Sequence, residues 1–166
     1  MANEISIEPF SAPDWEAVRS IYAEGIADGE ATFENTVPTW EQWDSATHKF
    51  CRLVAKLDGQ VIGWSTLKHV SPRDCYSGVA EVTVYVGASS RGHGVGKLLL
   101  ERVIAESEEN GIWTLQGSTF PENVASIRLQ QQCGFRIVGR REKVARQNGV
   151  WRDTVLTERR SRVVGI

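Results

Sequence analysis

The sequence contains few residues that could build a disulfide framework or a metal site. Its cysteines are odd in number and lie far apart, at Cys51, Cys75 and Cys133. A disulfide-bonded secreted domain and a zinc site both need cysteines that are paired or closely spaced. The histidines also lack the spacing of metal ligands. We therefore expect neither disulfide bonds nor a bound metal.

Long apolar runs and an excess of one charge are also absent. No apolar run approaches the length of about 20 residues that a membrane-spanning helix needs. The first residues, Met-Ala-Asn-Glu, lack the pattern of a signal peptide. A formal net charge of −2 gives no basis for broad nucleic-acid binding. We expect a cytoplasmic protein whose partners include neither a membrane nor a nucleic acid.

What is present is the composition of an ordinary globular protein. Hydrophobic residues make up 41% of the chain and charged residues 24%, close to the average for soluble domains. A length of 166 residues suits one domain with a sizeable core. No repeat, low-complexity stretch or linker interrupts the sequence. These features predict a single domain over residues 1–166.

Hydrophobic periodicity predicts a mixture of strands and helices. Strands are expected at residues 3–9, 51–57, 61–68, 79–86, 112–119, 135–144 and 150–158. Helices are expected from residue 14 to about 29, from 40 to about 48, at 92–110 and from 121 to about 133. Asp58-Gly59 is a strong hairpin signal, and Thr39 with Gln42 fits a capping box. This order indicates an α+β fold in three layers with a mixed central sheet.

A glycine-rich stretch after the predicted strand 79–86 is the most informative part of the chain. Residues 91–97 read Arg-Gly-His-Gly-Val-Gly-Lys, with glycines at every second position where a helix is expected to open. Glycine adopts positive φ, and the free N–H groups of a helix start bind anions. A P-loop is excluded because Gly96-Lys97 is followed by Leu98. The dinucleotide fingerprint is excluded because the third glycine comes one residue early.

The remaining pattern, Arg-x-x-Gly-x-Gly, resembles the acyl-CoA pyrophosphate loop of the GCN5-related N-acetyltransferase (GNAT) superfamily. The order of elements matches that superfamily over essentially the full length. Further motifs resemble the phosphinothricin N-acetyltransferase group, which includes enzymes for methionine sulfoximine and arsinothricin. These motifs are Gly-Glu-Ala-Thr-Phe-Glu at 29–34, Arg73-x-x-Tyr76 with Glu81, Pro-Glu-Asn-x-Ala-Ser-Ile at 121–127, and Gly-Val-Trp-Arg-Asp at 149–153.

The resemblance implies a GNAT fold with a mixed, mostly antiparallel sheet and about four flanking helices. It implies acetyl-CoA as donor, and as acceptor the α-amine of a small glutamate-like amino acid such as phosphinothricin, arsinothricin or methionine sulfoximine. The amine would attack directly in a ternary complex, and the family habit is a homodimer. The residues expected to contact acetyl-CoA are Val84, Tyr85, Val86, Arg91, Gly92, His93, Gly94, Val95, Gly96, Lys97 and Asn123.

Glu81 is the expected general base. The amine of an amino acid is mostly protonated at neutral pH, and a partly desolvated carboxylate can accept its proton directly or through water. A surface glutamate on an alternating strand fits the local pattern equally well, so the position in the motif is what favours catalysis. The residues that the resemblance implies around the acceptor are Glu30, Phe33, Arg73, Tyr76 and Arg152. A guanidinium suits a bidentate carboxylate or phosphinate.

One position departs from the family pattern. Many relatives carry tyrosine or histidine four residues before the Gly-Phe that follows the last helix, where it can protonate the leaving thiolate. Here that residue is Gln130, which donates a hydrogen bond but cannot deliver a proton. A thiolate with a pKa of about 8.5 is a tolerable leaving group. The general acid is therefore dispensable, or water or Tyr85 replaces it.

The sequence leaves two other functions possible. Acetylation of a protein N-terminus or of a lysine would favour an open groove, whereas the loops around Glu30 and Arg73 suggest a closed polar pocket. A CoA-binding module without turnover is disfavoured by Glu81 and mildly favoured by Gln130.

Overall fold

The computed structural model describes residues 3–166, so residues 1 and 2 of the expected domain lie outside the described residues. The strands in that range are β1 (Ser6–Pro9), β2 (Leu53–Leu57), β3 (Gln60–His69), β4 (Val79–Val86), β5 (Thr114–Thr119), β6 (Arg136–Gln147) and β7 (Val150–Arg160). The helices are α1 (Trp15–Asp28), α2 (Trp40–Ala46), α3 (Val95–Glu109) and α4 (Val124–Gln132). Short 3-10 turns occur at Ala12–Asp14, Asp74–Tyr76 and Ala88–Ser90.

The strands form one mixed sheet in the order β1-β2-β3-β4-β5-β7-β6. Neighbouring strands are antiparallel except for β4 and β5, which are parallel. A parallel pair needs a crossover, and here α3 makes the connection from β4 to β5. The mixed, mostly antiparallel sheet expected from the family resemblance is confirmed.

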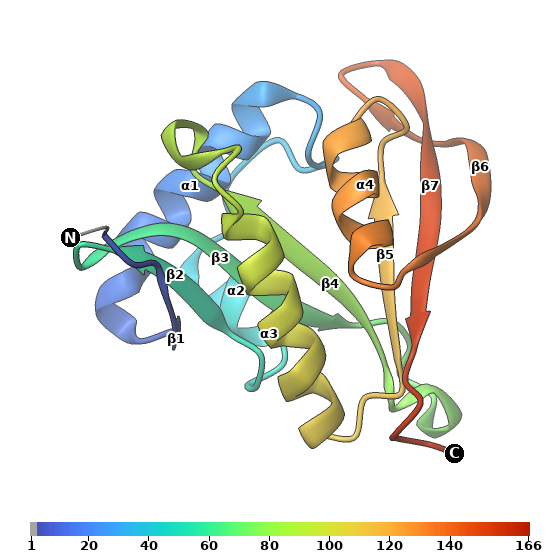
Figure 1. The fold of residues 1–166 in the computed structure, drawn as a ribbon. Coiled ribbons are helices and arrows are strands. Elements are labelled where there is room, and N and C mark those ends of the chain that lie inside the picture. Colours follow the sequence, from blue (N-terminus) through green and yellow to red (C-terminus); the bar gives the residue numbers. More distant parts are fainter. Residues whose placement is uncertain (1–2) are drawn as a thin grey trace.

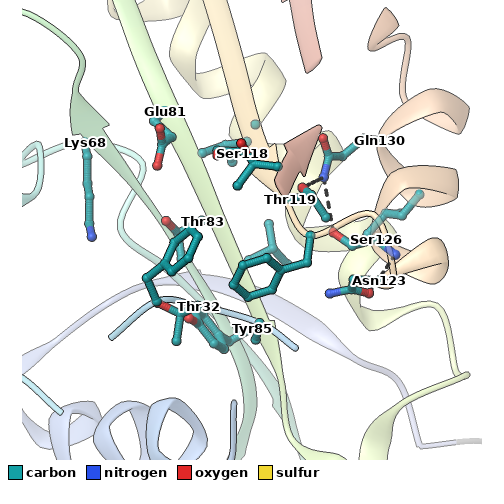
Figure 2. Close-up of a pocket in the computed structure, with 18 of the residues that line it drawn as sticks. Thr32, Lys68, Glu81, Thr83, Tyr85, Ser118, Thr119, Asn123, Ser126 and Gln130 are labelled. Carbon is teal, nitrogen blue, oxygen red and sulfur yellow. Dashed lines mark hydrogen bonds between the residues drawn. The ribbon is translucent and has the colours of Figure 1, made fainter. Parts of the chain in front are cut away.

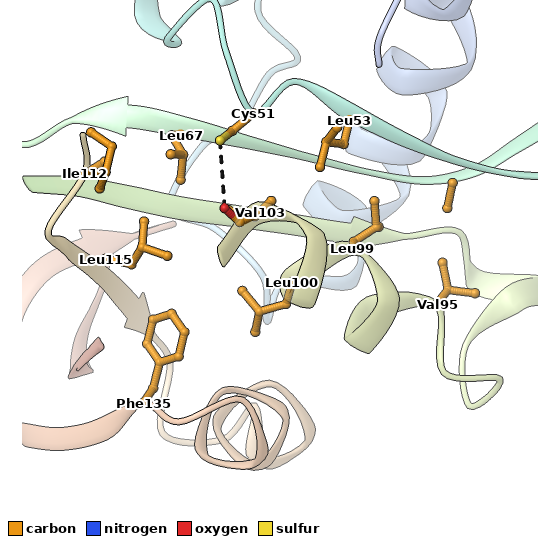
Figure 3. Close-up of a cluster of buried hydrophobic side chains, with 12 residues drawn as sticks. Cys51, Leu53, Leu67, Val95, Leu99, Leu100, Val103, Ile112, Leu115 and Phe135 are labelled. Carbon is orange, nitrogen blue, oxygen red and sulfur yellow. Dashed lines mark hydrogen bonds between the residues drawn. The ribbon is translucent and has the colours of Figure 1, made fainter. Parts of the chain in front are cut away.

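Helices cover both faces of the sheet, which gives the three layers (Figure 1). On one face α3 packs through buried Leu99 and Val103 against Leu67 of β3, within the larger hydrophobic cluster (Figure 3). α4 contacts α3, β5 and β6. On the other face, a second cluster joins Tyr22 of α1 and Trp43 of α2 to the sheet. The core therefore lies above and below β2, β3 and β4.

Two local signals in the sequence produce the turns that they predict. Asp58 and Gly59 both have positive φ, 51° and 77°, as the two central residues of a type I′ hairpin turn require. Thr39 caps α2: its Oγ1 accepts the N–H of Gln42 at 3.2 Å, and the Gln42 side chain accepts the N–H of Thr39 at 2.9 Å. The hairpin and the capping box are both confirmed.

The start of α3 differs from the expectation. A helix was expected from residue 92, but α3 begins at Val95. Gly92 and Gly94 each have a φ of 80°, in the left-handed region that a right-handed helix cannot contain. Both therefore lie in the loop before the helix, and Gly96 is the glycine inside it.

Other boundaries also shift by a few residues. The first strand begins at Ser6 instead of residue 3, and α4 begins at Val124 instead of residue 121. The last hairpin is longer than expected, because β6 extends to Gln147 and β7 to Arg160. An irregularity in the pairing of the two strands, between Arg141 and Ala145, lets β6 continue.

No helix within residues 3–166 combines the length and the apolar character needed to cross a membrane.

Candidate active site

The strands β4 and β5 separate halfway along their length. They pair only where Val79–Glu81 face Thr114–Gln116. Beyond that point β4 continues along β3 to Val86, and β5 continues along β7 to Thr119. Figure 1 shows the two strands diverging toward their carboxyl ends. Within the described residues, the edge of β4 that faces β5 therefore has no strand partner between residues 82 and 86.

A cavity of about 270 Å³ lies where the two strands diverge (Figure 2). Its walls come from β4, from the end of β5, from α4 and from the loop that follows α1. Its lining includes Thr32, Phe33, Glu34, Lys68, Glu81, Thr83, Val84, Tyr85, Ser118, Thr119, Asn123, Ser126 and Gln130. The cavity is polar along β5 and α4, and aromatic on the side of the α1 loop.

Glu81 lies at the point of divergence and is half-buried. Its Oε2 accepts a hydrogen bond of 3.2 Å from Nε2 of Gln116, its register partner on β5. Because side chains alternate along a strand, Glu81, Thr83 and Tyr85 share one face of β4. Lys68 lies directly opposite Glu81 on β3. A carboxylate in this position can take a proton from a ligand in the cavity.

Gln130 forms part of the cavity wall, and its whole amide group is hydrogen-bonded. Nε2 donates to Thr119 Oγ1 at 2.9 Å and to Ser126 Oγ at 3.1 Å (Figure 2). Oε1 accepts from the Thr157 hydroxyl. A Cβ atom on Gly117 would overlap both Gln130 and Thr157. Glycine at 117 therefore leaves the space for this network. Gln130 holds two hydroxyl groups at the wall of the cavity.

Tyr85 lies in an aromatic stack. Its ring packs against Tyr22 and Trp64, with centroids 5.1 and 4.9 Å away. Gly25 of α1 lies so close to the Tyr85 ring that a Cβ there would overlap it. Burial raises the pKa of Tyr85, and it raises the pKa of Tyr22 to about 12. Both phenols therefore stay protonated at neutral pH.

The glycine-rich loop lies beside the open edge of β4. A Cβ on Gly96 would be 3.0 Å from Leu129 of α4 and 3.7 Å from Val86 of β4, so these three elements meet here. A Cβ on Gly92 or Gly94 would have no atom of residues 3–166 within 4 Å, apart from its chain neighbours. The first N–H groups of α3 have no partner inside the helix. Open glycines and free N–H groups fit a diphosphate.

The loop after α1 is fastened to the last hairpin through Arg152. The guanidinium pairs with Glu30 at 2.7 Å and with Glu122 at 3.1 Å, and it donates to the carbonyl of Gly29 at 2.8 Å. It also lies 3.7 Å from the centroid of the Phe120 ring. Glu30 and Arg152 therefore bind each other. In this structure they hold the wall of the cavity and do not line it.

The other three residues expected around the acceptor divide into two groups. Phe33 lines the cavity and packs edge-on against Phe120, with centroids 4.8 Å apart. Arg73 and Tyr76 are exposed and do not line the cavity, and the Arg73 guanidinium lies 5.5 Å from the Tyr76 ring. The structure brings Phe33 to the cavity with Glu81 and leaves Arg73 and Tyr76 outside it.

The family model for the acetyltransferase (GNAT) family matches residues 15–135 of the chain. This chain belongs to the GNAT family. It is an N-acetyltransferase, and similar proteins include a phosphinothricin N-acetyltransferase from Alcaligenes faecalis. That relative is 33% identical over 153 residues, which cover 88% of this chain and 77% of the relative.

Two solved acetyltransferase structures share the fold over nearly the whole chain. The ribosomal-protein-alanine N-acetyltransferase from Brucella melitensis has a TM-score of 0.87 and 27% identity, over 94% of this chain and 99% of that one. A phosphinothricin acetyltransferase from Sinorhizobium meliloti, solved with acetyl-CoA, has a TM-score of 0.84 and 25% identity, over 94% of this chain and 88% of that one. The GNAT fold class is thus confirmed.

Several residues that line the cavity were not predicted from the sequence. Thr83 could have been found, because it follows Glu81 by two positions on an alternating strand. Lys68 depends on the register between β3 and β4. Ser118, Thr119 and Ser126 are short hydroxyl residues without a distinctive pattern. Within residues 3–166, no group of three or more His, Cys, Asp or Glu residues is arranged to hold a metal.

Proposed function

We propose that this GNAT enzyme transfers an acetyl group from acetyl-CoA to the α-amino group of a small glutamate-like amino acid. Phosphinothricin, arsinothricin and methionine sulfoximine represent the class. The observation that carries the proposal is the half-buried carboxylate of Glu81, which lines a cavity where β4 and β5 diverge. The 33% identity to a phosphinothricin N-acetyltransferase supports the acceptor class.

The donor site proposed for acetyl-CoA follows the open edge of β4 and the start of α3. Gly92 and Gly94 leave room for a diphosphate, and the N–H groups of residues 95–97 supply donors to it. Val84–Val86 supply backbone groups along the edge. Asn123 supports the opposite wall: its side chain caps α4 at Ser126 and donates to the Glu30 carbonyl at 3.3 Å. Acetyl-CoA supplies an activated acetyl carbon, bonded as a thioester.

The residues of the cavity each have a proposed part in the reaction. Glu81 accepts a proton from the α-ammonium group, which frees the nitrogen lone pair for attack on the acetyl carbon. Backbone N–H groups on the open edge of β4 donate hydrogen bonds to the acetyl oxygen and stabilise the negative charge that develops on it. Gln116 holds the Glu81 carboxylate in place through the hydrogen bond of 3.2 Å. As the N–C bond forms and the C–S bond breaks, the nitrogen loses its second proton to water, and the leaving thiolate takes up a proton from water.

A panel of amines tests this proposal directly. Purified enzyme is mixed with acetyl-CoA and each candidate acceptor, and release of the CoA thiol is followed with a thiol reagent. The panel contains phosphinothricin, arsinothricin, methionine sulfoximine, ordinary amino acids and a peptide with an N-terminal alanine. We expect thiol release with the first three and mass-spectrometric detection of the N-acetyl product. Thiol release with the peptide alone would contradict the proposal.

Acetylation of a protein N-terminus is a second candidate. The similarity to the Brucella ribosomal-protein-alanine N-acetyltransferase favours it. The loop at residues 29–34 argues against it, because the Phe33 ring packs on Phe120 in the cavity wall and leaves less room for a peptide chain. The peptide in the panel separates the two candidates.

We further propose that two copies associate through the hairpin of β6 and β7. Large apolar side chains are exposed on this hairpin, by 36 to 63% of their surface, at Ile137, Val138, Val144, Val150 and Trp151. Exposed apolar side chains on one hairpin can form an interaction surface. Light scattering after gel filtration is expected to give the mass of a dimer, and that of a monomer for Trp151→Glu. A monomeric parent enzyme would contradict this proposal.

A further inference from the structure

A second cavity, of about 440 Å³, adjoins the first. The two share four lining residues, Tyr22, Glu34, Lys68 and Thr83. The second cavity extends away from β5, across β3, to α2 and the segment before it, where Trp43 and Gln42 line it. It therefore begins beside Glu81 and runs in the direction opposite to the gap between β4 and β5.

Lys68 lies at the junction of the two cavities. It is half-buried and is the register partner of Glu81 on the adjacent strand. Figure 2 shows its side chain extending along the same face of the sheet as Glu81 and Thr83. Among residues 3–166, no ion pair within 4.0 Å includes Lys68. The carboxylates of Glu34 and Glu81 line the same junction, but neither makes a close ion pair with this ammonium, so an acidic group of a ligand can supply that close partner.

The position of Glu81 fixes the direction in which an acceptor can lie. Its α-amine must be near Glu81 to lose a proton, and it must face the gap between β4 and β5, where the donor site is proposed. The rest of the molecule then extends the other way, past Thr83 and Lys68 and into the second cavity. The indole of Trp43 and the amide of Gln42 lie at the far end of this path.

We infer that Lys68 is the counter-ion of the acidic side chain of the acceptor, and that the second cavity holds this side chain. The ligand class is an α-amino acid whose side chain ends in a phosphinate, an arsinate or a carboxylate. This inference rests on the proposed function and narrows it. The α-ammonium group then faces the carboxylate of Glu81 while the acidic end faces the ammonium of Lys68. Lys68 selects the acceptor by its charge, because an ammonium group places few constraints on the geometry of its partner.

The test compares an acidic acceptor with a neutral one of similar length. Steady-state constants for phosphinothricin and methionine sulfone are measured with the parent enzyme, Lys68→Met and Lys68→Arg. A hydrogen bond to a charged group is typically worth a factor of roughly ten or more in affinity. We expect Lys68→Met to raise the KM for phosphinothricin by roughly tenfold and the KM for methionine sulfone by less than about twofold. Lys68→Arg keeps the preference for phosphinothricin.

A matched control and two contrary outcomes complete the test. Lys49→Met removes an exposed lysine that lines neither cavity, and it is expected to change neither KM. An equal rise in KM for both acceptors would mean that Lys68 binds the α-carboxylate, and it would overturn the inference. A shift in the pH dependence of kcat with both KM values unchanged would mean that Lys68 acts on Glu81, and it would also overturn the inference.

Calorimetric binding separates this inference from the proposed function. Both acceptors are titrated into the parent enzyme and into Lys68→Met. If no amine is acetylated, the proposed function fails. Tighter binding of phosphinothricin than of methionine sulfone, lost in Lys68→Met, would still support the role of Lys68. Absence of any difference between the two ligands would overturn it.

Discussion

Two loops carry residues that the family motifs assign to the acceptor, and the fold holds them differently. The loop at residues 29–36 is fastened to the last hairpin: Arg152 donates to one of its carbonyls at 2.8 Å, and Gln147 donates to another at 2.9 Å. The loop at residues 70–78 is exposed around Arg73, whose backbone hydrogen bonds stay within the loop. Only the fastened loop contributes to the cavity wall. A residue that matches a substrate-binding motif of the family can therefore act by keeping the cavity wall in place, without lining the cavity itself.

Substitution of Glu81 is expected to lower catalysis the most, and the effects of substitutions in the two loops are compared with it. Glu81→Gln keeps the shape of the side chain and its contact with Gln116, but the amide cannot accept a proton at neutral pH. We expect kcat to fall by about 100-fold or more, in line with the contribution of a general base. Affinity for CoA, measured by calorimetry, is expected to stay within about twofold of the parent value. An unchanged kcat would remove Glu81 from the mechanism.

Breaking the fastened loop is expected to have the next largest effect. Arg152→Ala removes the partner of Glu30, of Glu122 and of the Gly29 carbonyl, and it uncovers the Phe120 ring. Loss of such a network destabilises a protein by about 2 kcal/mol. Displacement of the wall is expected to lower kcat/KM by roughly tenfold.

Arg146→Ala is the matched control for that experiment. Arg146 lies on the same hairpin, is exposed, and contacts the exposed ring of Trp151 with a separation of 5.4 Å. Because Trp151 belongs to the proposed dimer interface, Arg146→Ala is compared at a protein concentration at which it has the same mass as the parent enzyme. Its melting temperature and kcat/KM are then expected to match those of the parent. If the two variants behaved alike, the hairpin as a whole would be responsible and the fastening by Arg152 would not.

The difference between the loops could not be predicted from the sequence. Arg152 and Gly29 are separated by 123 positions, so no local pattern relates them. Turns and caps depend on neighbouring residues, which is why the hairpin at Asp58-Gly59 and the capping box at Thr39 were predicted correctly. The start of α3 was predicted wrongly because it depends on the φ angles of the glycines in residues 91–97, which the sequence does not give.

The candidate site also contains residues that could be predicted from the sequence and residues that could not. The position of Glu81 at the end of the short β4–β5 pairing follows from one motif on one strand. Lys68 becomes visible only when the register of β3 against β4 is known, because seven pairs of residues set which side chain faces Glu81. The network around Gln130 joins β5, α4 and β7, three elements whose packing no sequence pattern specifies.

A smaller change tests how much the position of the loop depends on the hydrogen bonds of the Gln147 side chain. Gln147→Leu removes the donor to the Thr32 carbonyl and one acceptor of Arg152, but it leaves the ion pair between Arg152 and Glu30. A single hydrogen bond contributes about 1 kcal/mol, so kcat/KM is expected to fall by about fivefold. A loss as large as that of Arg152→Ala would show that Gln147, and not the ion pair, holds the loop.

The smallest effect is expected at Arg73, in the loop that is not fastened. Its guanidinium is exposed, stacks on Tyr76 and does not line either cavity. We expect Arg73→Ala to change the KM for phosphinothricin by less than about twofold, as for most exposed side chains away from a site. The measurement uses the same thiol-release assay at saturating acetyl-CoA. A rise of about tenfold would mean that the loop at residues 70–78 closes over the acceptor, and the contrast between the two loops would then describe only the free enzyme.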